Sequence, residues 1–479
     1  MSNSPTKGFH LRLQPAQAWM VIIGFILFTA LCILVRAGRI VNLTFPAGTF
    51  AVGLFLYLRY PILYLGFTWW IWFLTPWVRR LADYQSGWTD PSPILLSPYL
   101  VTLVTIITFV RYFPKSYRQG GLPFIMCVFG SFYGFLVGVV NASIAGAILS
   151  YLGWITPILF GFHLFVHWRD YPKLKQNIQR TFLWGVLLTG GYGVVQYLVA
   201  PEWDKYWLNN AGTVVFGTPE PLGIRVFSTM NSPQPFAVVM MAGLILLFTN
   251  KTPLTFPAAA FGYLSFLLSL ARSAWLGWLM GLVVFVPSLK PRLQMRLVIT
   301  ILIMALFVIP LTTIEPFSDA INSRIESLTN TKNDASYNAR AEGYNEAMGL
   351  AVSEFIGRGV GSSLNIGGDF GSYDSGVLIM LFALGWFGTI PYLGGLLLLF
   401  FNIFESSEAS FDPVFSGARA IAIAVFAQIG LNSVQLGIFG VVMWGFLGIA
   451  MAARKYYSHQ KEAHTFGIKK DSFNRLNTT

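Results

Sequence analysis

Long runs of consecutive apolar residues, separated by short polar segments, dominate the pattern along the chain. A helix that crosses a membrane needs about 20 mostly apolar residues, and most of the runs approach that length. The runs are continuous rather than alternating with polar residues, which disfavours the strands of a lipid-facing barrel. The pattern therefore predicts an all-α polytopic membrane protein with about 12–14 transmembrane helices. The predicted spans are 17–35, 43–58, 61–78, 94–112, 122–140, 142–166, 178–200, 235–249, 254–271, 273–288, 295–314, 375–403, 416–432 and 434–452.

Composition narrows the class of protein further. Of the 479 residues, 55% are hydrophobic and 11% are charged, whereas soluble globular chains carry about 25% charged residues. This excludes a disordered protein and an ordinary cytosolic enzyme, because too few charged side chains remain to cover a soluble surface. Cys32 and Cys127 both lie in apolar runs, so no disulfide framework is expected. The first run, 17–35, has no small-residue cleavage site and is interpreted as a retained helix.

The basic residues indicate which side of the membrane each connection faces. With the N-terminus inside, 21 of the 32 Lys and Arg residues fall on the inner side and 11 on the outer side. This asymmetry follows the positive-inside rule and predicts a plasma (inner) membrane protein with both termini in the cytoplasm. The net charge of +12 is therefore interpreted as a feature of membrane topology rather than as a sign of a nucleic-acid partner.

Two connections, 201–234 and 315–374, are too long to be simple turns, and both fall outside in this topology. Within the second, apolar residues of 337–356 recur at helical spacing, which predicts a short amphipathic helix on the outer leaflet. The predicted regions are the N-terminal transmembrane helices 1–200, the outer loop 201–234, the transmembrane helices 235–314, the long outer loop 315–374, the C-terminal transmembrane helices 375–452 and the cytoplasmic basic tail 453–479.

Two arginines beside apolar spans are the first candidates for chemistry. Arg272 lies between two apolar runs, and Arg225 lies shortly before the span 235–249. Charged residues at membrane depth are costly and usually functional. The plain alternatives are a snorkelling arginine in a short turn for Arg272 and an exposed loop arginine for Arg225. Together, and with Arg340 or Arg358 from the long loop, they would form a guanidinium clamp for a diphosphate.

Such a clamp would stabilise a phosphate leaving group without a metal ion. The sequence has no HExxH motif, no Cys/His cluster and no convincing paired-carboxylate motif on the outer face, so neither a metal nor a cofactor is expected. His163 and His167 share a helical face, but no third ligand lies near them in the sequence. Packing at the inner membrane interface therefore explains this pair better than a metal site does.

Five short segments follow one another at intervals in the second half of the chain. They are RVFSTMNSPQP at 225–235, SLARSAWLG at 269–277, ARAEGYNEAM at 339–348, GRGVG at 357–361, and YDSG at 373–376 followed by LGWFG at 384–388. In this order they resemble the O-antigen ligase and polymerase superfamily. Its members are multi-pass membrane glycosyltransferases that transfer a glycan from a polyprenyl diphosphate carrier to an acceptor sugar on the outer side. The resemblance implies that Arg225 and Arg272 contact the diphosphate, with Arg340 in support.

One departure separates the branches of that superfamily. Ligase-type members carry a His-Asn pair in the long outer loop, where the histidine assists the acceptor hydroxyl, whereas this chain reads SYDSG at 372–376. The resemblance is thus to the polymerase branch, with a ligase proper as the alternative. Asp374 is the candidate general base for the acceptor hydroxyl, and it is equally suited to cap the helix predicted from 375. Tyr344 and Tyr373 are candidates for stacking on sugars, although tyrosines are common at membrane surfaces.

The resemblance also implies partners and leaves two rival functions. The expected partners are a polyprenyl-diphosphate-linked glycan, an acceptor glycan, membrane lipid and polysaccharide-assembly proteins, with no nucleic acid. A solute or inorganic-carbon transporter is the first rival, since such proteins have been proposed within the same superfamily. A transporter would place its site near the bilayer midplane on broken helices. The second rival, a flippase for lipid-linked oligosaccharides, predicts a central two-lobed cavity.

Overall fold

A computed structural model describes residues 15–212, 214–289, 347–362, 375–405, 409 and 411–476, together with scattered positions between 291 and 302. These residues form helices and no named strand, and one isolated antiparallel bridge joins Gly217 and Ile224. Eight of the described helical segments are long and apolar enough to cross a membrane, and shorter apolar helices accompany them. The prediction of an all-α polytopic membrane fold is therefore confirmed.

The described helices are numbered in chain order. They are α1 (Ala16–Leu34), α2 (Gly38–Arg59), α3 (Pro61–Ser86), η1 (Pro93–Leu96), α4 (Ser97–Leu103), α5 (Ile106–Ser116), η2 (Tyr117–Gln119), α6 (Leu122–Asn141), α7 (Ile144–Val166), η3 (Trp168–Asp170), α8 (Tyr171–Val199), α9 (Glu202–Ala211), η4 (Val214–Phe216), α10 (Pro233–Leu247), α11 (Thr255–Leu268), α12 (Arg272–Phe285), η5 (Val286–Ser288), α16 (Gly376–Phe404), α17 (Pro413–Phe426) and α18 (Gly437–Leu476).

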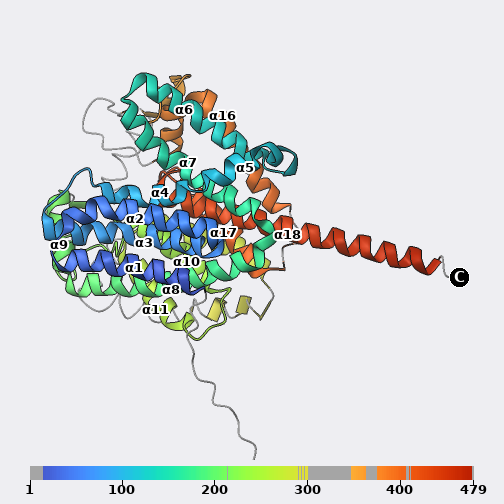
Figure 1. Ribbon diagram of the computed structural model, residues 1–479, viewed down its shortest axis with the longest axis horizontal. Helices are drawn as coiled ribbons and strands as arrows, with labels where there is room; N and C mark the ends of the chain where they lie inside the picture. The colour runs from blue at the N-terminus through green and yellow to red at the C-terminus, as the bar shows by residue number, and fades with distance from the viewer. Residues whose placement is uncertain are drawn as a thin grey trace, which may run out of the picture.

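Most predicted spans correspond to one helix each. The span 94–112 instead divides into η1, α4 and α5, with a turn at Val104 and Thr105 whose dihedral angles stay in the right-handed helical region. Helix α18 continues far beyond its predicted end and projects from the bundle in Figure 1. The span 295–314 and the first part of the predicted helix 337–356 lie largely outside the described residues, while residues 347–353 are helical.

Helix α18 lies at the centre of the packing, and α1 lies at its edge. α18 packs against α7, α17 and α10, whereas α1 contacts mainly its neighbour α2 (Figure 1). In their most apolar windows, 83% of α18 residues are buried but only 17% of α1 residues. The exposed side chains of α1 are leucines, isoleucines and phenylalanines, as expected for a helix that faces lipid.

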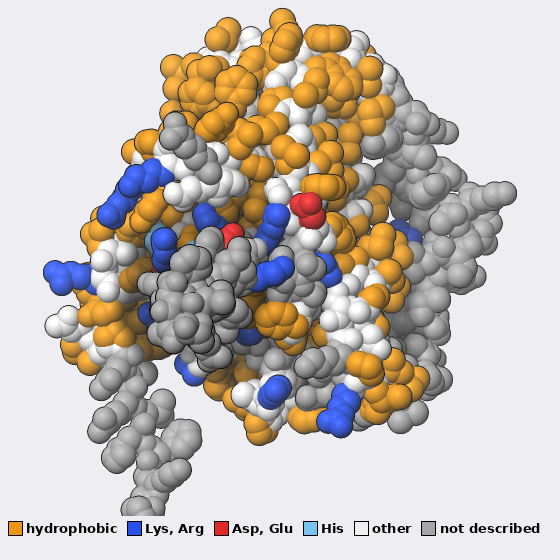
Figure 2. Space-filling model, turned by 90° about the vertical axis from the view of Figure 1, so that its right-hand side faces the viewer, with side chains coloured by type: hydrophobic (Ala, Val, Ile, Leu, Met, Phe, Trp, Pro, Cys, Tyr) orange, Lys and Arg blue, Asp and Glu red, His pale blue; other side chains and the backbone are white. Residues whose placement is uncertain are grey.

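The bundle has two different ends. Helix α9 and the loop that follows it lie at one end, and α18 projects from the other (Figure 1). Viewed from the end with α18, Lys and Arg side chains gather near the middle of the face, and hydrophobic side chains cover much of the surrounding surface (Figure 2). This end of the bundle therefore presents a group of basic side chains within a largely hydrophobic face.

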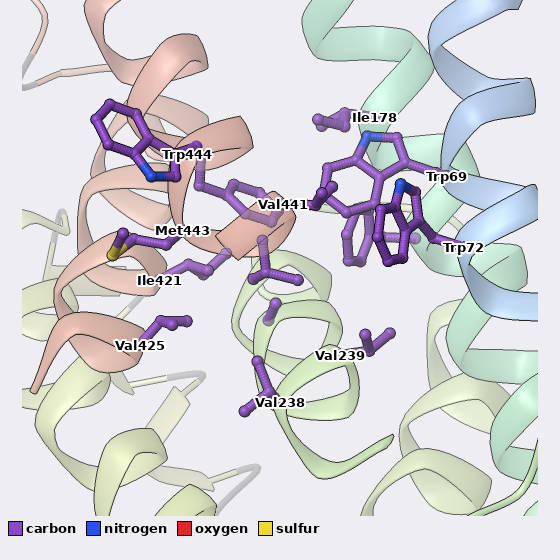
Figure 3. Close-up of a cluster of buried hydrophobic side chains, with 14 of the residues drawn as sticks. Trp69, Trp72, Ile178, Val238, Val239, Ile421, Val425, Val441, Met443 and Trp444 are labelled. Carbon is purple, nitrogen blue, oxygen red and sulfur yellow. The ribbon is translucent and has the colours of Figure 1, made fainter. Parts of the chain in front are cut away.

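The core joins four helices through aromatic and branched side chains. Trp69 and Trp72 of α3 face Val441 of α18, with Val238 and Val239 of α10 below them (Figure 3). Trp69 is fully buried, and its ring centroid lies 5.0 Å from that of Phe182 in an edge-on arrangement. Lipid tails are as apolar as these side chains, so close packing rather than water exclusion stabilises the contact.

Helices α7 and α18 approach each other closely at two glycines. A Cβ atom placed on Gly448 would lie 2.3 Å from the carbonyl oxygen of Gly161, and one placed on Gly161 would lie 2.5 Å from the carbonyl oxygen of Trp444. No side chain fits at those distances. The two glycines thus allow the backbones to touch, in the manner typical of membrane helix pairs.

Candidate functional site

A cavity of about 630 Å³ lies at the end of the bundle where α10, α16 and α18 begin. Its size is within the range of about 300–1,000 Å³ that small-molecule sites occupy. Apolar side chains and glycines make up most of its walls, with four aromatic residues and five uncharged polar residues among them, and none of the described lining residues is charged. Its lining includes Trp72, Tyr99, Ser150, Trp154, Met230, Asn231, Pro235, Gly359, Val360, Gly361, Ser362, Ile379, Ala383 and Ser433.

Segments that are distant in the sequence meet at this cavity. Met230, Asn231 and Pro235 come from the segment 225–235, and Gly359 to Gly361 come from the segment 357–361. Ile379 and Ala383 lie between the two halves of the last segment, on the first turns of α16. Two of the five segments singled out in the sequence therefore line one cavity, together with the first turns of α16 that join the two halves of the last segment.

The loop that carries Met230 and Asn231 rests on a buried arginine. Arg80 of α3 is fully buried, and its Nε atom lies 3.0 Å from Oδ1 of Asp204, which is also fully buried. The same guanidinium donates to the carbonyl oxygen of Met230 at 2.6 Å and to that of Ser228. One side chain thus neutralises a buried carboxylate and fixes the backbone of the cavity wall.

Asp204 and Gln196 complete this network from α9 and α8. Asp204 Oδ2 accepts hydrogen bonds from Tyr192 at 2.7 Å and from Gln196 Nε2 at 2.8 Å. The Gln196 Oε1 atom in turn accepts from the backbone N–H groups of Phe227 at 3.0 Å and Ser228 at 2.7 Å. Ser228 has a φ of 51°, which is uncommon for a residue with a side chain, and the network holds it there.

Arg225 ties this loop to the turn that precedes α12. Its side chain is partly buried and donates to the carbonyl oxygens of Val215 at 2.9 Å, Ser269 at 3.3 Å and Leu270 at 3.1 Å. Arg272, also partly buried, is the first residue of α12 directly beyond that turn. The structure therefore brings the segments 225–235 and 269–277 together, and much of the Arg225 guanidinium already binds backbone oxygen atoms.

The connection between α17 and α18 links α12 to the start of α16. Asn432 donates from Nδ2 to the Ser273 hydroxyl at 3.1 Å, and its carbonyl oxygen accepts from the N–H of Gly376 at 3.1 Å. Gln435 donates to the carbonyl oxygen of Gly376 at 3.2 Å. Asn432 thus bonds both Ser273, the neighbour of Arg272, and Gly376, the first residue of α16. The next residue, Ser433, lines the cavity.

The glycine-rich segment 357–361 is an extended strap between α6 and α16. Val360 donates its N–H to the carbonyl oxygen of Gly134 at 2.9 Å, and Arg358 donates its N–H to that of Phe382 at 2.7 Å. Gly359 has a φ of 88°, and a Cβ atom on it would lie 2.2 Å from the nitrogen of Gly138. Glycine is required because both the backbone conformation and the close approach exclude a side chain.

Helix α16 is interrupted where the strap meets it. Gly385 is not helical, with φ 57° and ψ −171°. The N–H of the next residue, Trp386, donates instead to the carbonyl oxygen of Phe355 at 2.9 Å. Irregular backbone inside a membrane requires such replacement partners. Here Phe355 accepts from the N–H of Trp386, and Arg358 of the strap donates to the carbonyl oxygen of Phe382.

Arg358 is not among the residues that line the cavity, and its side chain contacts Glu354 and Phe382. Its Nε atom lies 2.8 Å from Oε1 of Glu354, and its guanidinium carbon lies 5.0 Å from the centroid of the Phe382 ring. Of the other predicted site residues, Arg340, Tyr344, Tyr373 and Asp374 lie outside the described residues. Ser375, next to Asp374, is buried at the start of α16.

Sequence reasoning missed the pair formed by Arg80 and Asp204. Both residues were visible as charges next to apolar spans, in the same way as Arg225 and Arg272. Their partnership was not visible, because 124 positions separate them and only the fold places α9 beside α3. The remaining sequence signal was the tandem Arg79-Arg80 directly after the predicted span 61–78. Both arginines lie buried within α3, which extends past that span.

The described residues contain no group of three or more His, Cys, Asp or Glu side chains placed to hold a metal ion. His163 and His167 do lie together, with ring centroids 4.3 Å apart. Comparison with known proteins adds no relative, since no family model, curated protein or solved structure matches the chain.

Proposed function

We propose that the chain is a membrane glycosyltransferase that polymerises glycan units carried on a polyprenyl diphosphate at the outer face of the plasma membrane. The observation that carries the proposal is the convergence of the family-like segments on one cavity. Segments 225–235 and 357–361 and the start of α16 line it, and segment 269–277 is hydrogen-bonded to its neighbours. An uncharged cavity with aromatic residues in its lining, beside arginine-bearing turns, suits a substrate with a neutral glycan and an anionic diphosphate.

In this proposal Arg272 binds the donor diphosphate from the first turn of α12. A permanently charged guanidinium stabilises the negative charge that develops on a phosphate leaving group. Arg225 orients that turn through the carbonyl oxygens of Ser269 and Leu270 and contributes charge beside it. Asp374, adjacent to the start of α16, is the proposed base for the acceptor hydroxyl.

The test is the length distribution of the surface glycan in a strain that carries Arg272→Ala. We expect the polymer ladder to collapse to single units, because the leaving group loses its main charge partner. Arg39→Ala is the matched control, since Arg39 is an exposed arginine near the start of α2, away from the cavity. A normal ladder from a stably expressed Arg272→Ala protein contradicts the proposal.

The same strains separate the polymerase from the ligase alternative. Deletion of a polymerase leaves single lipid-linked units, whereas deletion of a ligase leaves full-length polymer on the lipid carrier.

Transport is the second candidate function, and the break in α16 favours it. Transporters bind their substrates at discontinuous helices, and the break at Gly385 lies close to the strap that lines the cavity. Deletion that changes neither glycan length nor lipid-linked intermediates supports transport instead of glycosyl transfer.

A further inference from the structure

A second cavity, of about 420 Å³, lies at the opposite end of α3 and α7 from the first. It forms where α2 ends, α3 begins, α7 ends and α8 begins. Unlike the first cavity, it is lined by ionisable side chains as well as by proline, leucine and isoleucine. The polar lining residues are Arg59, Tyr60, His163, His167, Asp170 and Lys173.

The fixed charges at this cavity have a positive balance. Lys173 contacts Asp170, with 3.3 Å between Nζ and Oδ1, and both side chains are largely exposed. This pair is neutral as a whole, so the guanidinium of Arg59 leaves the cavity with one net positive charge. Arg59 is exposed at the last position of α2, and guanidinium forms bidentate contacts with phosphate oxygens.

Two imidazole rings add hydrogen-bonding atoms on the α7 side. His163 is 2% exposed, and its Nδ1 atom lies 2.7 Å from the Thr108 hydroxyl. His167 donates from Nδ1 to the carbonyl oxygen of His163 at 2.8 Å. Within the described parts of the chain, neither Nε2 atom has a hydrogen-bond partner, and both residues line the cavity. A proton on either Nε2 would be donated to an anion in the cavity.

Two helix starts also face this cavity. Ile62 and Leu63 belong to the first turn of α3, and Lys173 and Leu174 belong to the first turn of α8. Backbone N–H groups of a first helical turn have no partner within the helix, and the helix dipole makes them favourable for negative charge. The helix starts, the Arg59 guanidinium and the two imidazoles thus all favour a negatively charged ligand.

We propose that this cavity binds a phosphate group, supplied either by the headgroup of an anionic lipid or by free phosphate. The apolar lining residues, the net positive charge and the basic end face of Figure 2 all suit this ligand. The site is separate from the proposed glycosyltransferase cavity, and the proposal does not depend on that function.

The test uses the purified full-length protein and the double variant Arg59→Gln/Lys173→Gln. Lys115→Gln/Lys251→Gln is the matched control, because it removes the same charge from exposed lysines that do not line the cavity. Binding of inorganic phosphate is measured by thermal shift against sodium chloride of equal ionic strength. Binding of phosphatidylglycerol is measured by native mass spectrometry after reconstitution with phosphatidylglycerol and phosphatidylcholine.

We expect the wild-type protein and the control to bind at least one probe, and the cavity variant to bind it about tenfold more weakly or worse. A phosphate response without retained phosphatidylglycerol identifies free phosphate as the ligand, and the reverse result identifies the lipid headgroup. The proposal is overturned if neither probe binds, or if the cavity variant and the control retain the probe equally.

Discussion

The two cavities differ in how the protein uses the charged residues around them. Near the first cavity, Arg80 binds Asp204 and two carbonyl oxygens, and Arg225 binds three more carbonyl oxygens. The described lining itself is uncharged. At the second cavity, Arg59 and Lys173 are exposed lining residues. Arginines thus hold the backbone that forms the wall of the first cavity, whereas Arg59 and Lys173 line the second cavity and are exposed to solvent.

This difference indicates which substitutions affect folding and which affect only a ligand. A buried arginine that holds a loop is part of the structure, and its loss leaves a carboxylate without a partner. An exposed arginine at a helix end contributes little to stability. Three substitutions, in order of decreasing effect, test this division.

Arg80→Met should have the largest effect, a loss of about 3–5 kcal/mol in the free energy of unfolding. The reason is that Asp204 would remain fully buried without its charge partner. The measurement is denaturant unfolding in detergent. The double variant Arg80→Met/Asp204→Leu should recover part of the loss, because it removes the unpaired charge as well. Equal stability of Arg80→Met and the wild type would show that the first cavity does not depend on this pair.

Gly359→Ala should lower the free energy of unfolding by about 2–4 kcal/mol, from backbone strain and overpacking together. Its φ is 88°, and the new methyl group would meet the backbone of α6 at Gly138. Gly349→Ala is the control, since a Cβ atom there meets nothing within 4 Å. If thermal unfolding places both variants at the same temperature, the strap is not packed against α6 as described.

Asp412→Asn should have the smallest effect, a change in how the stability of the protein depends on pH. Burial raises the pKa of its carboxyl, but hydrogen bonds and charge from Lys175, with Tyr171 and the N–H of Val414, lower that pKa below its ordinary value overall. A carboxyl with a depressed folded-state pKa stabilises the protein above its unfolded pKa of about 4, and this contribution disappears as the pH falls below that value.

The wild type should therefore lose more stability than Asp412→Asn between pH 6 and pH 3, by about 1 kcal/mol. Thermal unfolding at both pH values measures the difference. Asp170→Asn is the control, because its contact with Lys173 is exposed. Parallel pH profiles for the wild type and Asp412→Asn would show that the ion pair between Lys175 and Asp412 does not stabilise the fold.

The sequence predicted the helices well, because the length of an apolar run is a local property. It did not predict the break at Gly385, because the hydrogen-bond partner of the next N–H comes from Phe355, outside α16. For the candidate site, the segments 225–235 and 357–361, which the sequence singled out, line one cavity, whereas the predicted residues Arg340 and Asp374 lie outside the described residues. The role of Arg80 was not predicted, because a buried arginine and a snorkelling arginine look identical beside an apolar run.

The strap has a consequence for the order in which the chain assembles. During synthesis, α6 appears first, then the strap, and α16 last. The N–H of Trp386 has its replacement acceptor only once Phe355 is in place. Phe355 and the strap are synthesised before α16, so the hydrogen-bond partners that the break requires are already present when α16 emerges. The bend therefore depends on the segment that precedes α16 as well as on Gly385, whose φ of 57° favours glycine.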